Sequence, residues 1–365
     1  MSLAFDLTPT IVNRTAIFHV ALDTARAFAS TGCTFRYARQ YVRAPIENIT
    51  QLNKLRRNTL QEILGNGGLI RERQLGMQAS TFRRPKDVGR IFFFDPLYVL
   101  FENAAPEDIV LFLDLSPLTN PEWHNPHVAE LYRIAFERTL ASGARAVSIS
   151  HFTAHSLWAN YGLPLDEITV LPLYLRGSFT GSADHCAHPQ KKLLFVGSLE
   201  TRKNIRGLIA AFNQSDLAAE GFELFIAGGN GHGAELIRAA AKDARGVHLL
   251  GFVPDEQLRE LYATSSAFVY PSYLEGFGLP ILEAARAGLP IMTSITGATA
   301  EVAPPNSVLV DPLDLFSIAE GLRQIALMPQ AIRANISALN REYVQAFTFE
   351  RYLTTVKQLC NSGSY

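Results

Sequence analysis

The most informative segment of the sequence is Tyr270-Pro271-Ser272-Tyr273-Leu274-Glu275-Gly276-Phe277-Gly278-Leu279-Pro280-Ile281-Leu282-Glu283-Ala284. The apolar run of residues 267–270 predicts a short buried strand, and the glycines that follow it predict a loop. Pro280 stands where a first helical residue is expected, because its fixed φ suits that position and its missing N–H is not needed there. The sequence therefore predicts a strand, a glycine-containing loop and a helix.

The start of this helix predicts a binding site for an anion. The N–H groups of Phe277, Gly278 and Leu279 precede the first helical turn, where backbone donors lack partners within the helix. Glu283 lies one turn into the helix on the face turned toward the loop, and Glu275 lies on the loop itself. Amides for a diphosphate and two carboxylates for ribose and sugar hydroxyls suit a sugar nucleotide. The alternative is that Glu283 complements the helix dipole and Glu275 is an ordinary loop residue.

The same alternation of strand and helix extends on both sides of this stretch. Each expected strand is short, apolar on both faces and followed by a helix, which predicts a doubly wound parallel sheet with ligands beyond the carboxyl ends of its strands. The expected strands lie at 193–196, 222–227, 247–250, 267–270 and 290–292, and the expected helices at 204–214, 232–243, 255–264 and 280–287.

A second loop of this sheet carries two cations. Gly197 and Ser198 follow the first expected strand, and Arg202 and Lys203 lie a few residues further along the same loop. Positive charge at this position would neutralise a diphosphate as it departs. A solvated surface pair is the alternative.

A third loop offers a competing interpretation. Gly229, Gly231 and Ala234 fit the G-x-G-x-x-A dinucleotide fingerprint between a strand and a helix. The acidic residue expected about 20 positions later is absent, because residues 249–254 contain none and Asp255 begins a helix. A nicotinamide enzyme is therefore the weaker hypothesis.

The first half of the chain predicts another parallel sheet. Strand-like runs at 3–5, 91–94, 109–113 and 146–149 alternate with helical stretches such as 15–29 and 128–141. Residues 177–190 are polar, small and unpatterned, as expected of an interdomain linker. We expect an acceptor-binding domain over 1–180 and a donor-binding domain over 190–345. The last helical segment, at about 329–360, is long enough to pack back across the first domain, and we expect residues 346–365 to form a C-terminal helix that does so.

Composition excludes some classes of protein. Among 365 residues, 48% are apolar and 18% charged, which excludes a disordered chain. The net charge of -1 excludes a protein that coats nucleic acid. Residues 36–90, however, contain twelve Lys and Arg against four Asp and Glu, a charge of +8 set against -9 elsewhere.

Apolar residues recur at helical spacing in the window 36–90 and predict one or two basic amphipathic helices. Such a basic face suits anionic lipid head groups or a pyrophosphate-bearing acceptor, and an ordinary solvated helix is the alternative. The three cysteines are far apart, and no signal peptide or apolar span is recognisable. We therefore expect a cytoplasmic protein, with peripheral contact at the inner face of the membrane.

Several motifs together resemble one family. Residues 191–350 resemble the nucleotide-binding half of retaining GT-B glycosyltransferases of family 4, through Ile-Ala-Gly-Gly at 226–229, Leu-Gly-Phe-Val at 250–253 and the Glu-x7-Glu pair in the opening stretch. The first half resembles a mannosyl- or rhamnosyltransferase-like branch more loosely, through Asp114-Leu115-Ser116-Pro117-Leu118 and Pro121-Glu122-Trp123-His124.

This resemblance implies a GT-B fold, with two Rossmann-like doubly wound domains facing a central cleft. It implies that Glu275 contacts the donor sugar, that Glu283 holds the ribose, and that Lys203 and Arg202 bind the diphosphate. Further residues implied at the donor are Gly276, Phe277, Gly278, Leu279, Gly197 and Ser198, with Phe252 and Val253 bordering the base. The family needs no metal, and we expect no cofactor.

The chain also departs from the family pattern. Ser198 replaces an arginine, so Arg202 would supply that charge, and Leu113 replaces a histidine of the first domain. The N-terminal loop, glycine-rich in most relatives, contains Arg14, whose side chain would contact phosphate instead. Our candidates for the acceptor side are Arg14, Asp114, His124 and His127.

The resemblance implies a retaining hexosyltransferase, with mannose from GDP-mannose as the expected donor. The acceptor would be a glycan or a lipid-linked molecule of cell-surface polysaccharide, such as lipopolysaccharide, and no nucleic-acid partner is expected. Two alternatives stay open: a nucleotide-sugar epimerase of the same architecture, and a non-catalytic subunit that binds a nucleotide sugar.

Overall fold

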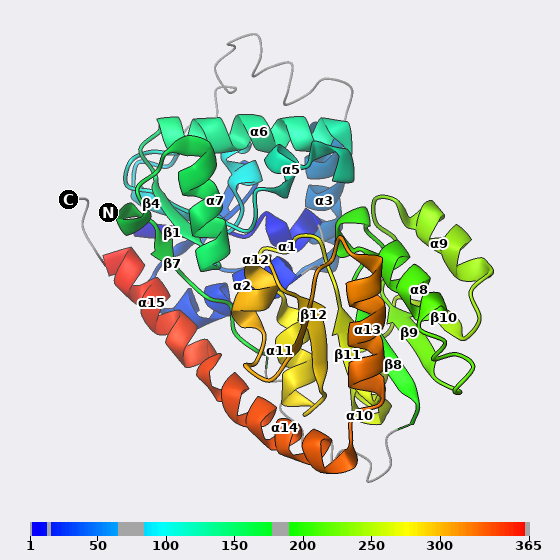
Figure 1. Ribbon diagram of the computed structural model, residues 1–365. Helices are drawn as coiled ribbons and strands as arrows, with labels where there is room; N and C mark the ends of the chain where they lie inside the picture. The colour runs from blue at the N-terminus through cyan, green and yellow to red at the C-terminus, as the bar shows by residue number, and fades with distance from the viewer. Residues whose placement is uncertain (1, 13–15, 65–83, 177–189, 362–365) are drawn as a thin grey trace. The chain divides into compact units, whose positions relative to one another are not determined.

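The computed structural model describes residues 2–12, 16–64, 84–176 and 190–361 (Figure 1). The chain divides into two compact units. Unit 1 contains Met1–Leu171 and Leu353–Tyr365, and unit 2 contains Pro172–Tyr352. Within the described residues each unit holds one sheet. Of the predicted linker, only Gln190 lies within the described residues.

The sheet of unit 1 has the order β3-β2-β1-β4-β5-β6-β7. Its strands are β1 (Ser2–Asp6), β2 (Thr34–Tyr37), β3 (Gln40–Val42), β4 (Val88–Phe93), β5 (Ile109–Phe112), β6 (Arg145–Ser148) and β7 (Thr169–Val170). The pairings are parallel as expected, except that β2 and β3 form an antiparallel hairpin. Its two-residue turn holds Ala38 at a φ of 53°, and Tyr37 pairs with Gln40.

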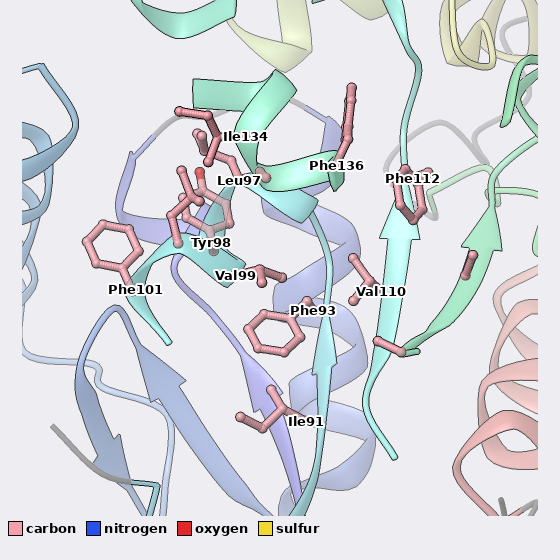
Figure 2. Close-up of a cluster of buried hydrophobic side chains, with 14 of the residues drawn as sticks. Ile91, Phe93, Leu97, Tyr98, Val99, Phe101, Val110, Phe112, Ile134 and Phe136 are labelled. Atoms are coloured by element: carbon pink, nitrogen blue, oxygen red, sulfur yellow. The ribbon is translucent and has the colours of Figure 1, made fainter. Parts of the chain in front are cut away.

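The helices of unit 1 cover this sheet. They are α1 (Pro9–Val12), α2 (Ala16–Phe28), α3 (Ile49–Leu64), α5 (Ser116–Thr119), α6 (Pro126–Ala141) and α7 (His151–Tyr161), with 3-10 turns η1 (Ala29–Thr31), η2 (Pro96–Phe101), η3 (Pro121–Trp123) and η4 (Leu165–Glu167). Figure 2 shows the core, where Phe93 of β4 and Phe112 of β5 lie with Phe136 of α6. All three are fully buried. Burial of such a side chain stabilises the fold by about 1.5–3 kcal/mol.

The sheet of unit 2 is parallel throughout, in the order β10-β9-β8-β11-β12-β13. Its strands are β8 (Lys192–Val196), β9 (Glu223–Ala227), β10 (Val247–Gly251), β11 (Ala267–Tyr270), β12 (Ile291–Ser294) and β13 (Val308–Val310). Five of them match the predicted runs. The sixth strand, β13, was not predicted from the sequence, because three residues are too few to show a strand pattern. Its extended conformation is defined by its pairing with β12.

The helices of unit 2 follow their strands. They are η6 (Thr201–Lys203), α8 (Ile205–Gln214), α9 (Ala234–Lys242), α10 (Asp255–Thr264), α11 (Leu279–Arg286), α12 (Gly297–Val302), α13 (Leu315–Ala326), α14 (Gln330–Tyr343) and η7 (Val344–Ala346), and α15 (Phe349–Asn361) runs on past the boundary between the units. Helix α13 packs against α8, while α11 lies against β11 and β12 (Figure 1).

The prediction of one long helical segment at about 329–360 is wrong. The segment consists of two helices, α14 and α15, separated by η7 and Phe347. The carbonyl of Phe347 accepts a hydrogen bond from the backbone N–H of Leu175 (3.0 Å), and its ring packs on Tyr343 and Phe277. Tertiary contacts therefore replace helix continuation at this residue. Within the described ranges, no helix combines the length and the apolar composition that crossing a bilayer requires.

Candidate active site

The candidate site lies at the carboxyl edge of the unit 2 sheet. Strands β8 and β11 are neighbours and parallel, so the loops that follow them emerge side by side. The backbone N–H of Tyr273 donates to the carbonyl of Arg202 (2.9 Å), which joins the two loops directly. The cationic loop and the opening stretch of sequence therefore form one site.

Lys203 and Arg202, predicted to bind the diphosphate, both contact Glu275, which is predicted to contact the donor sugar. Lys203 Nζ lies 2.6 Å from Glu275 Oε1, and Arg202 Nη1 lies 2.7 Å from Glu275 Oε2. Arg202 Nε also donates to Oε2 of Glu200 (2.8 Å), whose Oε1 accepts from the Ser198 hydroxyl (2.6 Å). Two cations and two carboxylates thus form a locally neutral cluster, a pairing that the sequence did not predict.

Two hydroxyl groups complete the surroundings of Glu275. The Tyr270 hydroxyl donates to Glu275 Oε1 (2.7 Å) and accepts from Lys203 Nζ (2.7 Å). The Ser272 hydroxyl donates to the same carboxylate oxygen over a longer distance of 3.3 Å. The sequence predicted Tyr270 at the end of a strand, but it predicted no role for the hydroxyl of Tyr270 or of Ser272. The sequence does contain a signal for both: Tyr270 and Ser272 carry hydroxyl groups at the end of the strand, a few residues before Glu275.

This environment keeps Glu275 ionised. Burial raises the pKa of its carboxyl group, but the nearby Arg202 and Lys203 outweigh burial and hold that pKa at about 2. Burial lowers the pKa of Lys203, and Glu275 opposes this shift. Glu275 is therefore a fixed negative charge at neutral pH and a poor proton donor.

Gly197 and Asn204 shape the cationic loop. A Cβ atom at Gly197 would lie 3.1–3.3 Å from the end of the Lys203 side chain, so a larger residue there would displace that side chain by a few tenths of an ångström. Asn204 adopts a left-handed φ of 53° between η6 and α8. Its buried Nδ2 donates to the carbonyls of Pro271 (3.1 Å) and Pro312 (2.8 Å), which fastens the loop to the end of β11.

The glycines after β9 have a packing role. A Cβ atom at Gly228 would collide with the carbonyl oxygen of Gly197, and one at Gly231 would collide with the Glu200 side chain. Gly229, the first glycine of the dinucleotide fingerprint, has no neighbour that would exclude a Cβ. Close approach to the cationic loop therefore explains two of these glycines without a dinucleotide.

The start of α11 retains the donors that the sequence predicted. Within the described residues, the N–H groups of Phe277, Gly278 and Leu279 make no hydrogen bond. Gly278 has a φ of 111°, a left-handed value that turns the chain into the helix. Gly276, Phe277 and Gly278 are buried, and unsatisfied buried donors at a helix start are suited to an anion.

Glu283 differs from Glu275 in its environment. The buried Tyr262 hydroxyl donates to Glu283 Oε2 (2.9 Å), and the side chain is half-buried. Burial raises the pKa of Glu283 to about 7, Asp255 adds to this shift, and the Tyr262 hydrogen bond and Arg176 oppose it. The two carboxyl groups, eight residues apart in sequence, therefore differ in pKa: that of Glu275 is about 2 and that of Glu283 is about 7.

The residues expected to border the base differ in exposure. Phe252 follows β10 and is 81% exposed, while Val253 beside it is buried. An aromatic ring presented at the edge of the sheet offers a stacking surface for a base, and this role stays a prediction.

The acceptor-side candidates lie in unit 1 and do not form one group. Asp114 Oδ1 accepts from the backbone N–H (2.8 Å) and the hydroxyl (2.5 Å) of Ser116, and that hydroxyl lies 2.9 Å from His124 Nε2. His127 Nε2 instead lies 2.7 Å from the carbonyl of Ile63, which ties α6 to α3. Arg14 lies outside the described residues.

The basic window of residues 36–90 is partly internal. Arg36 is fully buried, 2.9 Å from Asp6, so it belongs to no surface face. Arg39, Arg43 and Arg84 also form ion pairs, with Glu62, Asp87 and Asp108 respectively. Lys54, Arg56 and Arg57 on α3 are exposed. Lys54, Arg56 and Arg57 therefore carry the basic surface of α3.

Comparison with known proteins adds independent information. The model of the family described as glycosyl transferases group 1 matches residues 185–342. The O-antigen chain mannosyltransferase B of Escherichia coli is 29% identical over 260 residues, covering 67% of this chain and 68% of the relative. The D-rhamnosyltransferase WbpZ of Pseudomonas aeruginosa is 30% identical over 232 residues, covering 60% of this chain and only 59% of that relative.

A solved structure shows the fold. The crystal structure of WaaG, a glycosyltransferase involved in lipopolysaccharide biosynthesis, is similar with a TM-score of 0.65 at 18% identity, over 99% of this chain and 100% of that one. This likeness, with the two parallel sheets, confirms the expected α/β fold of two Rossmann-like domains.

Proposed function

We propose that this chain, whose residues 185–342 match group 1 glycosyltransferases on a GT-B fold, is a retaining hexosyltransferase. It transfers mannose from GDP-mannose to a glycan or lipid-linked acceptor in the synthesis of cell-surface polysaccharide. The observation that carries this proposal is the cluster of Lys203, Arg202 and Glu275 beside the unsatisfied amides of α11. These groups supply positive charge, one fixed negative charge and anion-binding donors at one edge of a sheet.

In this mechanism the site stabilises charge as the glycosidic bond breaks. Negative charge grows on the diphosphate, and the amides of Phe277–Leu279 with Lys203 and Arg202 stabilise it. Lys203 donates to Glu275 and Tyr270, which occupies two of the three N–H donors of its ammonium group. The third donor is the one assigned to the leaving group.

Glu275 acts without transferring a proton. With its pKa at about 2, the carboxylate accepts hydrogen bonds from sugar hydroxyls and offsets positive charge that develops on the sugar ring. A phosphate oxygen of the donor takes the proton of the attacking acceptor hydroxyl. The proposal therefore includes no metal, and a chelator should leave the rate unchanged.

The choice of mannose rests on the relatives. The E. coli relative is named a mannosyltransferase, and the P. aeruginosa relative a rhamnosyltransferase. For the acceptor, the exposed basic residues of α3 suit a lipid-linked molecule at an anionic membrane surface.

Thermal-shift measurements with GDP-, UDP-, ADP- and dTDP-sugars test the donor, because a ligand that binds the folded state raises the apparent melting temperature. GDP-mannose should give the largest rise in melting temperature. In a separate assay, the protein should transfer mannose from GDP-mannose to a lipid-linked acceptor. Epimerised sugar after incubation with donor alone would identify an epimerase instead. Binding without turnover on any acceptor would favour a non-catalytic subunit, and no shift with any nucleotide sugar would refute the proposal.

A further inference from the structure

We propose that the buried hydroxyls of Tyr270 and Tyr262 are positioning groups, each of which orients a carboxylate for a different part of the donor. Tyr270 fixes Glu275 and Lys203 for the reacting sugar, and Tyr262 fixes Glu283 for the nucleoside. This inference rests on the proposed function and adds two residues to it.

Tyr270 closes a triangle of buried polar atoms. Its hydroxyl lies 2.7 Å from both Lys203 Nζ and Glu275 Oε1, which are 2.6 Å from each other. The three residues are each no more than 8% exposed. The Tyr270 ring stacks with the rings of both Phe195 and Phe268, at centroid distances of 5.2 and 5.6 Å. A rigid ring therefore sets where the carboxylate and the ammonium group lie.

Tyr262 orients the second carboxylate, that of Glu283, in the same way. It is 2% exposed on α10, and its hydroxyl donates to one oxygen of Glu283 on α11. The ring packs against Phe268 of β11 at a centroid distance of 5.9 Å. Phe268 thus contacts both tyrosines, and one buried ring supports both positioning groups.

The two hydroxyls should affect different kinetic constants. Glu275 is placed at the sugar, where charge changes in the transition state, so its misplacement should lower kcat. Glu283 is placed at the nucleoside, which is bound equally in the ground state and the transition state, so its misplacement should raise KM without changing kcat.

The test compares Tyr270→Phe and Tyr262→Phe with wild type, using GDP-mannose as donor and GDP as binding probe. Tyr270→Phe should lower kcat roughly 10- to 100-fold, the range expected for loss of a hydrogen bond to a charged group. Tyr262→Phe should weaken GDP binding and raise the donor KM roughly 10-fold, with kcat nearly constant. Ser272→Ala, which removes the longer bond to the same Glu275 oxygen, should lower kcat less than Tyr270→Phe.

Tyr132→Phe is the matched control. It removes a tyrosine hydroxyl that donates to the buried Asp95 carboxylate over 2.8 Å in unit 1, outside the donor site. Melting temperatures of all variants measure any general loss of stability. If Tyr270→Phe and Tyr262→Phe change kcat and KM no more than Tyr132→Phe does, the inference is wrong although the enzyme is active. If wild type neither binds GDP-mannose nor transfers from it, the proposed function fails instead.

Discussion

Replacing Glu275 by glutamine tests the charge balance of the site. The variant Glu275→Gln keeps the shape of the side chain and removes its negative charge. It also turns one of the two accepting oxygens into an NH2 donor, so the amide oxygen can accept either from Tyr270 and Lys203 or from Arg202, but not from both sides. Lys203 then loses its carboxylate partner in a buried position, and Arg202 retains Glu200. We expect unit 2 to lose stability at neutral pH.

The magnitude follows from the pKa of Glu275. That pKa falls from 4.5 to about 2 on folding, and at about 1.4 kcal/mol per pKa unit this shift stabilises the folded state by about 3 kcal/mol at pH 7. Removing one partner of a buried ion pair costs about 3–5 kcal/mol. The two figures overlap at about 3 kcal/mol, which is the loss of stability that we expect.

The sign of the pH dependence is also determined. A carboxyl group whose pKa is depressed by folding stabilises the protein above its unfolded pKa, and this stabilisation is lost as pH falls toward 2. The difference between wild type and Glu275→Gln should therefore be about 1 kcal/mol smaller at pH 4 than at pH 7.

Chemical denaturation measures this difference, and the chain supplies an internal control. Both of its tryptophans, Trp123 and Trp158, lie in unit 1, so their fluorescence follows unit 1 while circular dichroism follows both units. The substitution should shift the dichroism transition of unit 2 and leave the tryptophan transition unchanged. Equal stability of the two proteins at pH 7, or a constant difference from pH 7 to pH 4, would refute the reasoning.

The donor site, the glycines after β9 and the basic surface of α3 lead to four other predictions. Lys203→Ala and Glu283→Ala should each weaken nucleotide binding roughly 10-fold or more in calorimetry, and unchanged affinity in both would contradict the site assignment. Because burial raises the pKa of Glu283 from 4.5 to about 7, nucleotide affinity should rise as pH increases through 7, while the stability of the folded state should fall as pH rises from 4.5 to about 7; Glu283→Gln should abolish both trends. Gly228→Ala should lower the melting temperature, because its Cβ collides with the Gly197 carbonyl, whereas Gly229→Ala, which has room for a Cβ, serves as its control. Replacing Lys54, Arg56 and Arg57 by glutamine should reduce sedimentation with anionic vesicles at low salt, and salt-independent binding by wild type would count against a membrane role for α3.

Local sequence patterns predicted the elements near the site well. Glycine loops after short apolar strands, and proline at a helix start, have strong local conformational preferences, so β8, β11 and α11 were found at nearly their observed bounds. Parallel order then placed Glu275 near Arg202 and Lys203. Other features were missed because they depend on distant residues. The hairpin of β2 and β3 contains the buried Arg36, whose charge is tolerated only because Asp6 lies beside it.

Local patterns along the chain were enough to predict the α/β class, the succession of strands and helices in unit 2, and the loops that carry the candidate site. These depend on short-range periodicity and backbone preference. The partners of the polar side chains could be read only from the folded chain: Glu275 contacts both cations and Tyr270, Tyr262 donates to Glu283, and His127 ties α6 to α3. Ion pairing and burial set the charge states of these side chains, and both depend on neighbours that folding brings together from distant parts of the chain.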